Sequence, residues 1–180
     1  MKTYYVALAL GLLAAAAPAS AQEADDILSK VINAPLPGAD RVDGASGRVR
    51  NDPAVQGGKA LRIEVPGKSE KAWAVALSNP INKPVKMGDN IVLAFWARLA
   101  KGENGATSAT LPYNAVQLAE APYTPLFKDG VTIAPEWKMY EIRGRADRDY
   151  SAGSLNVTLH LATGRQTVDI GPIFVLDMGQ

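Results

Sequence analysis

Residues 155–161 read Leu-Asn-Val-Thr-Leu-His-Leu, a strict alternation of apolar and polar side chains. Successive side chains of a β-strand point to opposite faces of a sheet, so the leucines and Val157 share one face, and Asn156, Thr158 and His160 share the other. The second face is polar but carries no formal charge. This stretch therefore predicts a strand with one side in a core and the other side free to hold a ligand.

A second stretch, residues 91–99, is apolar on both faces. Ile91, Leu93 and Phe95 lie on one face, while Trp96 and Arg98 lie on the other. Such a strand belongs in the middle of a sheet. The side with Trp96 and Arg98 is expected either to be covered by a loop or to line a groove.

The rest of the chain consists of short runs with period-2 character that turn residues separate, and no segment keeps a 3.6-residue apolar period for three turns. A short amphipathic start at residues 24–32 could form one or two helical turns. The pattern predicts an all-β fold, an antiparallel β-sandwich or barrel. The expected strands are 60–65, 72–78, 90–99, 115–118, 130–133, 138–145, 155–162 and 166–176.

The first 21 residues have the features of a secretory signal peptide. Lys2 precedes an apolar stretch that is too short to cross a bilayer, and residues 19–21 read Ala-Ser-Ala, with cleavage expected before Gln22. Removal of this segment leaves 159 residues and equal numbers of acidic and basic side chains. We therefore expect a secreted or periplasmic bacterial protein, with an N-terminal segment and first strands at residues 22–57 and the remainder of one sandwich at residues 58–180.

Composition excludes many classes of function. The 180 residues include no cysteine and one histidine, which rules out disulfides, iron–sulfur and zinc clusters and a thiol nucleophile. The net charge of +1 gives no reason to expect a nucleic-acid partner.

Catalytic motifs are absent from the sequence as well, so we expect no enzymatic activity. A serine triad would have to use His160, whose strand neighbours offer no acidic orienting group. The alternative of a small polysaccharide-modifying enzyme depends on Glu136 and Glu141, because glycoside hydrolysis needs two carboxyl groups.

Binding chemistry is better represented. A sugar ring has apolar faces and a rim of hydroxyls, so its site combines flat aromatic rings with Asn, Gln, His or Arg side chains. The candidate stacking residues are Trp73, Tyr113 and, as a second choice for the opposing ring, Tyr123. The candidate hydrogen-bonding residues are His160, Asn156, Gln166 and Arg98, all expected in a groove on one sheet.

Several local patterns follow one another in an order known from one protein family. They are residues 58–63 (GKALRI), 72–77 (AWAVAL), 87–89 with 94–98 (MGD, AFWAR), 135–140 (PEWKMY), 155–161, and 166–172 (QTVDIGP). From about Gly58 to Gly179 the chain resembles carbohydrate-binding modules of the family 4 and family 9 type. These are galactose-binding-like jelly-roll domains, often attached to bacterial xylanases.

The resemblance implies a jelly-roll β-sandwich, a stacking role for Trp73 with an opposing aromatic, and hydroxyl contacts from His160. It also implies a polysaccharide or oligosaccharide ligand and a polysaccharide-degrading enzyme as a partner. Two departures stand out: Ala74 and Ala76 follow the tryptophan where relatives have polar residues, and Gly171-Pro172 replaces the acids that hold a structural calcium. Asp169 and Asp177 are hard oxygen donors that could substitute, but we expect no cofactor and no metal.

The sequence therefore predicts a non-catalytic, secreted carbohydrate-binding domain without a nucleic-acid partner or a membrane span. The alternative is an envelope structural or protein-interaction sandwich that has lost sugar binding, and it is motivated by Ala74 and Ala76.

Overall fold

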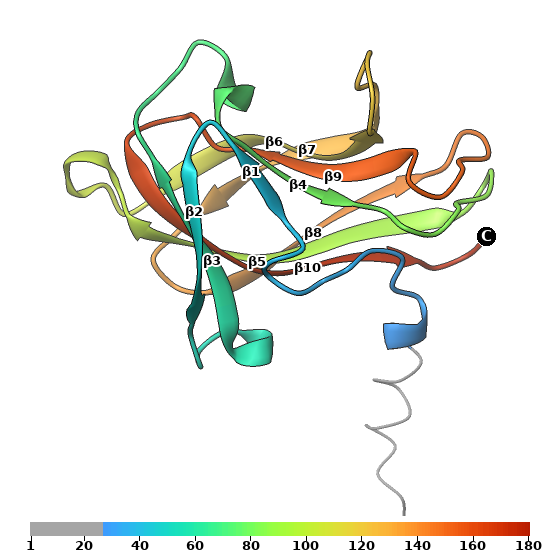
Figure 1. Ribbon diagram of the computed structural model, residues 1–180, viewed down its shortest axis with the longest axis horizontal. Coiled ribbons are helices and arrows are strands. Elements are labelled where there is room, and N and C mark those ends of the chain that lie inside the picture. Colours follow the sequence, from blue (N-terminus) through green and yellow to red (C-terminus); the bar gives the residue numbers. More distant parts are fainter. Residues whose placement is uncertain (1–26) are drawn as a thin grey trace, which may run out of the picture.

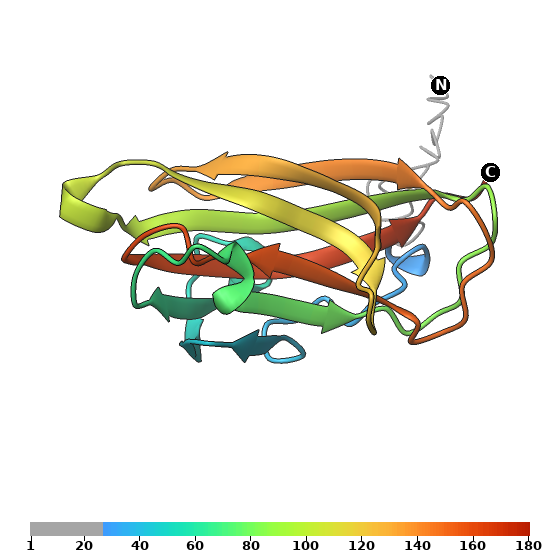
Figure 2. The same ribbon diagram turned by 90° about the horizontal axis from the view of Figure 1, so that it is seen from above.

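The computed structural model describes residues 27–180, which fold into two stacked antiparallel sheets of five strands each (Figures 1 and 2). The first sheet has the order β1 (Arg41–Asp43), β4 (Ala76–Pro80), β9 (Leu155–His160), β6 (Ala109–Leu118), β7 (Pro125–Ile133). The second has the order β2 (Ser46–Asn51), β3 (Lys59–Val65), β10 (Gln166–Asp177), β5 (Asn90–Lys101), β8 (Lys138–Arg145). The predicted antiparallel β-sandwich is confirmed.

The core lies between the inner faces of the two sheets. On β9 the apolar residues Leu155, Val157 and Leu159 are buried, as the alternation predicts. The ring of Phe95 on β5 stacks on that of Tyr140 on β8, with centroids 5.7 Å apart. Burial of apolar area at about 25 cal/mol per Å² is the main stabilising contribution in a chain without disulfides.

The boundaries of several strands differ from the prediction. β8 has the predicted bounds, whereas β6 and β7 begin earlier, at Ala109 and Pro125. The expected strand at 72–78 is wrong in its first half, because β4 begins at Ala76 and the 3-10 helix η2 (Ala72–Ala74) precedes it. Two further 3-10 turns are η1 (Gln56–Gly58) and η3 (Glu103–Gly105).

The prediction for residues 91–99 is confirmed. β5 pairs with β10 on one edge and with β8 on the other. The outward side is covered by a loop, the first of the two expected alternatives: Val55 is buried, and the indole Nε1 of Trp96 donates to Oε1 of Gln56 at 3.0 Å. A Cβ built on Gly171 would lie 2.7 Å from Val55, so a glycine at this bulge of β10 lets the loop approach.

An arginine cluster occupies the outer face of the second sheet. The Asp169 carboxylate is fully buried and accepts two hydrogen bonds from Arg62, at 2.7 and 2.9 Å, and one from Arg98 at 2.9 Å. Arg50 adds a contact at 3.2 Å, and Arg98 also binds Asp52 at 2.9 Å. Burial alone would raise the pKa of Asp169, but the bonds from Arg62 and Arg98 outweigh it and hold that pKa below its usual value.

A buried polar network joins residues 33–40 to both sheets. The side-chain amide of Asn33 donates to Oδ1 of Asn79 at 2.9 Å and to the carbonyl of Ile173 at 2.7 Å. Nδ2 of Asn79 donates in turn to Oδ1 of Asp40 at 2.8 Å. Oδ2 of Asp40 is buried without a partner in the described chain, and burial raises the pKa of this carboxyl to about 6.

The predicted signal peptide at residues 1–21 lies outside the described residues. Within residues 27–180, no helix has the length and apolar character that a bilayer crossing needs.

Candidate functional site

Three rings meet on the outer face of the first sheet. The imidazole of His160, at the end of β9, stacks on the ring of Tyr113 on β6, with centroids 4.2 Å apart and planes 11° from parallel. The centroid of the Trp73 indole, on η2, lies 6.1 Å from that of His160, and the two ring planes are tilted by 54°. Trp73 is 58% exposed. We call the outer surface around Trp73, Tyr113 and His160 the aromatic face.

Strand register brings these residues together from three separate parts of the chain. Ala76 of β4 lies opposite His160, and Asn114 of β6 lies opposite Leu159, so Tyr113 falls beside His160. Because β4 starts only at Ala76, the turn before it places Trp73 at the same end of the sheet. The η2 loop rises above this end at the top of Figure 1.

Gly44 supports that loop and yields a testable prediction. It has φ +76°, and a Cβ built on it would lie 1.8 Å from the carbonyl oxygen of Ala74, next to Trp73. Gly44→Ala is therefore expected to destabilise the fold and to displace η2. The control is Gly153→Ala, which has φ +79° but meets nothing within 4 Å. We expect Gly44→Ala to lower the free energy of unfolding in urea by about 1–3 kcal/mol more than Gly153→Ala, and equal losses would contradict the close approach.

The floor of the aromatic face consists of small and neutral polar side chains. Ser78 and Ala115 lie opposite Thr158 on either side, and Gln117 lies opposite Asn156. The hydroxyl of Tyr113 donates to Oε1 of Gln117 at 3.0 Å. Oδ1 of Asn156 is buried and has no hydrogen-bond partner among the described residues. These floor residues carry no charge, and Thr158, Ala115 and Gln117 are buried beneath the rings and their neighbours.

Electrostatics keep the ring cluster neutral. Burial lowers the pKa of His160, so the imidazole is uncharged at pH 7, with one nitrogen as donor and the other as acceptor. Burial also raises the pKa of the Tyr113 hydroxyl. A cation lies at the rim, where Nζ of Lys128 is 5.1 Å from the centroid of the Tyr113 ring. The prediction missed Lys128, because it started the strand at 130 instead of 125.

Tyr123 lies away from the three rings. It is 55% exposed and lies in the β6–β7 loop. This loop follows the end of β6 that is opposite to the Trp73 end of the sheet. Leu118 is five positions after Tyr113 along the strand, a distance of about 16 Å. The N–H of Leu118 bonds to the Thr124 carbonyl, so the Tyr123 turn begins at that distance from Tyr113. The loop borders a hollow of about 440 Å³ lined by residues 118–121 and 152–154. Tyr123 therefore does not contact the ring cluster, and only a ligand that extends along β6 would reach both.

The structure does not bring Arg98 and Gln166 to the aromatic face, and the expectation of a common groove is corrected. Both belong to the second sheet, on β5 and β10. The Arg98 guanidinium is bound to Asp52 and Asp169. The buried amide of Gln166 donates to the Leu161 carbonyl and to Oγ1 of Thr163, which fixes the β9–β10 turn. Alternation assigned a face to each strand, but it could not tell which sheet the strand joins.

The residues considered for metal binding do not fit a metal. Both oxygens of Asp169 are bound by arginine, and Oδ1 of Asp177 accepts the Gly179 N–H. The described chain contains no group of three or more acids and histidines that could hold an ion.

The two acids considered for catalysis both lie on exposed surface. Glu136 is exposed in the turn before β8, and Glu141 is ion-paired with Arg143 at 2.9 Å on an exposed surface. Neither residue borders the aromatic face.

Several solved structures with a similar architecture match most of this chain. A family 4 carbohydrate-binding module (CBM4) matches with TM-score 0.60 and 15% identity over 78% of this chain and 96% of its own. The second N-terminal cellulose-binding domain of Cellulomonas fimi β-1,4-glucanase C matches with TM-score 0.59 and 18% identity, over 86% and 95%. The fold is that of the carbohydrate-binding modules.

A third solved structure extends the likeness to another group of these modules. The CBM22-1 xylan-binding domain of Xyn10C from Paenibacillus barcinonensis matches with TM-score 0.53 and 14% identity, over 84% of this chain and 93% of its own. Comparison of the sequence with family models and with curated proteins finds no match. At these identities the carbohydrate-binding-module likeness establishes the jelly-roll fold, and the ligand has to be argued from the residues of this chain.

Proposed function

We propose that this protein is a secreted, non-catalytic polysaccharide-binding module whose ligand lies on the aromatic face. The observation that carries the proposal is the contact of Trp73, His160 and Tyr113 on an outer surface of the sandwich. Rings in a hydrophobic core need no further explanation, but an indole that is 58% exposed beside two further rings is a platform for a sugar face.

The surroundings of the rings suit a neutral sugar chain. Ser78 offers a part-exposed hydroxyl, and the small side chain of Ala76 leaves room beside His160. Because the three rings carry no charge at pH 7, stacking and hydrogen bonds would supply the affinity. The likeness to modules named as cellulose-binding and xylan-binding supports the same class of ligand.

Trp73→Ala is the variant that tests the site. Loss of one stacking ring is expected to weaken binding about tenfold or more, which corresponds to roughly 1.4 kcal/mol. The measurement is calorimetry or affinity electrophoresis with soluble xylan, β-glucan and mannan. Met87→Ala is the matched control, because Met87 is similarly exposed (62%) but lies in the β4–β5 connection.

Two outcomes would count against the proposal. Failure of the wild-type protein to bind any of these polysaccharides would reject glycan binding, and equal affinities for Trp73→Ala and wild type would reject the site. Release of reducing ends by the purified protein, abolished by Glu136→Gln or Glu141→Gln, would show catalysis and overturn the non-catalytic assignment.

A protein partner is the second candidate function. Ala74 follows Trp73 in the chain and Ala76 lies opposite His160, and the Tyr113 hydroxyl is already bonded to Gln117, so part of the face is apolar. A pull-down that recovers one defined envelope protein, lost with Trp73→Ala, together with no binding to any glycan, would favour this candidate.

A further inference from the structure

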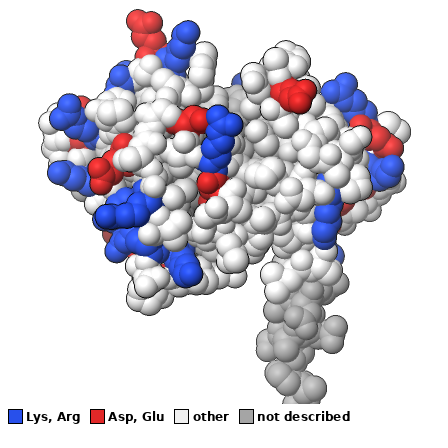
Figure 3. Space-filling model, viewed as in Figure 1, with Lys and Arg blue, Asp and Glu red and all other residues white. Residues whose placement is uncertain are grey.

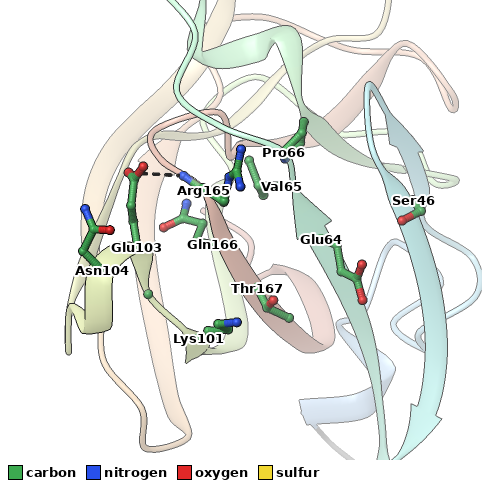
Figure 4. A pocket seen from close by; sticks show the side chains of 11 residues that line it. Ser46, Glu64, Val65, Pro66, Lys101, Glu103, Asn104, Arg165, Gln166 and Thr167 are labelled. Carbon is green, nitrogen blue, oxygen red and sulfur yellow. Dashed lines mark hydrogen bonds between the residues drawn. The ribbon is translucent and has the colours of Figure 1, made fainter.

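The second sheet carries a hollow on its outer face, away from the aromatic face. Its volume is about 850 Å³, and it lies between the η3 loop with β5 on one side and β3 with β2 on the other (Figure 4). A smaller hollow of about 250 Å³ adjoins it and shares Ser46 and Glu64. We call the two together the polar trough.

Strand register arranges the floor of the polar trough in a row. Ser46 of β2 lies opposite Glu64 of β3, Glu64 opposite Thr167 of β10, and Thr167 opposite Lys101 of β5. Four neighbouring strands thus present a hydroxyl, a carboxylate, a hydroxyl and an ammonium group over about 14 Å. Figure 4 shows Glu103 and Arg165 above the half of this row that Thr167 and Lys101 form, and Oε2 of Glu103 accepts the Arg165 backbone N–H at 3.4 Å.

Most charged side chains of the polar trough are not engaged in ion pairs within the described chain. Within residues 27–180, the side chains of Lys101, Arg165, Arg48 and Glu64 take part in no hydrogen bond or ion pair. Residues of this kind on an open surface are available to a ligand.

The register also sets two arginines against each other. Arg48 lies directly opposite Arg62, an arrangement of like charges that is unfavourable by itself. Arg62 is committed to Asp169 through two bonds, and Arg48 forms no ion pair within the described chain, although Glu64 lines the same smaller hollow. Elsewhere on this side of the molecule, Figure 3 shows basic side chains gathered at the lower left, near the lower ends of β2 and β3 in Figure 1. An anion above Arg48 would relieve this repulsion.

We infer that the polar trough is a second binding site, for a saccharide chain that carries carboxylate groups. Lys101, Arg165 and Arg48 would receive the carboxylates, since Arg–carboxylate and Lys–carboxylate bonds are the strong charge-assisted kind. Sugar hydroxyls would donate to Glu64 and Glu103. Ser46 and Thr167 add groups that both donate and accept.

This site would differ from the aromatic face in the interactions that hold the ligand. The lining residues in the described chain include no aromatic side chain, so stacking contributes nothing and charge supplies the affinity. Binding at the polar trough should therefore weaken with salt, whereas stacking on the aromatic face should be less sensitive to it. Sites on opposite sheets would let one molecule hold a neutral and an acidic chain at once.

The test uses oligogalacturonate as the probe, with its methyl ester as the neutral counterpart. Wild type should bind the acid form, with affinity about tenfold weaker on going from low to high salt, and should bind the ester far more weakly. The triple variant Arg48→Ala/Lys101→Ala/Arg165→Ala should lose at least about tenfold in affinity. The charge-matched control Lys83→Ala/Lys86→Ala/Arg148→Ala changes three cations in or next to the β4–β5 and β8–β9 connections, and it should bind like wild type.

The outcomes separate this site from the aromatic face. Loss of oligogalacturonate binding in the triple variant, but not in its control, supports the inference. If wild type also binds neutral glycans on the aromatic face, the triple variant should retain that binding. No oligogalacturonate binding, equal binding of acid and ester, or equal losses in the triple variant and its control would overturn it. Displacement by equimolar inorganic phosphate would show a general anion site and would also overturn the assignment to a saccharide.

Discussion

Asp169→Ala is expected to lower the free energy of unfolding by about 3–5 kcal/mol. The carboxylate is fully buried and joins Arg62, Arg98 and Arg50, which come from three strands of the second sheet. Its removal leaves three guanidinium groups close together with Asp52 as the one remaining acid of the cluster. Because the arginine side chains are 23–32% exposed, water can relieve part of the loss, and the lower end of the range is expected.

Urea denaturation at constant pH measures the effect, and an exposed ion pair gives the control. Asp149→Ala removes the partner of Lys86 and the acceptor of the Met87 N–H at a site where both charged side chains are about two-thirds exposed, and the loss is expected to be about 1 kcal/mol. Losses of similar size for Asp169→Ala and Asp149→Ala would show that the arginine cluster does not stabilise the second sheet.

Replacement of Asp40 by Asn is expected to change how stability depends on pH. In the folded protein the pKa of Asp40 is raised to about 6, from an ordinary value of 3.8, by its burial. Between these two values the folded state holds a proton that the unfolded state releases, so the stability of wild type falls as the pH rises. Above about pH 6 the full penalty of about 3 kcal/mol is present. The Asn side chain cannot ionise, so the variant does not lose stability in this way as the pH rises.

The unfolding free energy of Asp40→Asn minus that of wild type should therefore rise by up to about 3 kcal/mol from about pH 3.5 to about pH 7.5. His160 contributes in the opposite direction, because its lowered pKa makes the folded protein more stable as the pH rises toward the ordinary pKa of histidine. This contribution is the same in wild type and variant, so it cancels when the two free energies are subtracted. Asp147→Asn should give a difference of opposite sign, because the Tyr150 hydroxyl holds the pKa of Asp147 low. A flat difference curve for Asp40→Asn would contradict the buried ionisable carboxyl.

Side-chain alternation was sufficient to predict the sandwich, but not the polar contacts inside it. Strands such as β8 and β9 follow from local pattern, because half-buried strands need one apolar face. Asn79 on β4 is different. Its side chain is fully buried and bonds to Asn33 and Asp40. A partner 46 residues away in the sequence leaves no local signal that could reveal it.

The candidate site was predictable in its residue types and less so in its assembly. Trp73, Tyr113 and His160 come together because strands β4, β9 and β6 are neighbours, and strand order is decided by long-range packing. The same limit explains the corrections. Arg98 lies on the outer face of its strand, as alternation predicts, but its strand is in the second sheet, where Asp169 binds it.

The most direct test of glycan binding on the aromatic face is an NMR titration with neutral xylo- or cello-oligosaccharides that follows the three tryptophan indole N–H signals. We expect the Trp73 signal to shift with the amides of Ala76, Tyr113 and His160, and the signal of Trp96, bonded to Gln56 beneath the loop of the second sheet, to stay in place. No shift at saturating oligosaccharide, or shifts at Trp96 without any at Trp73, would contradict the account.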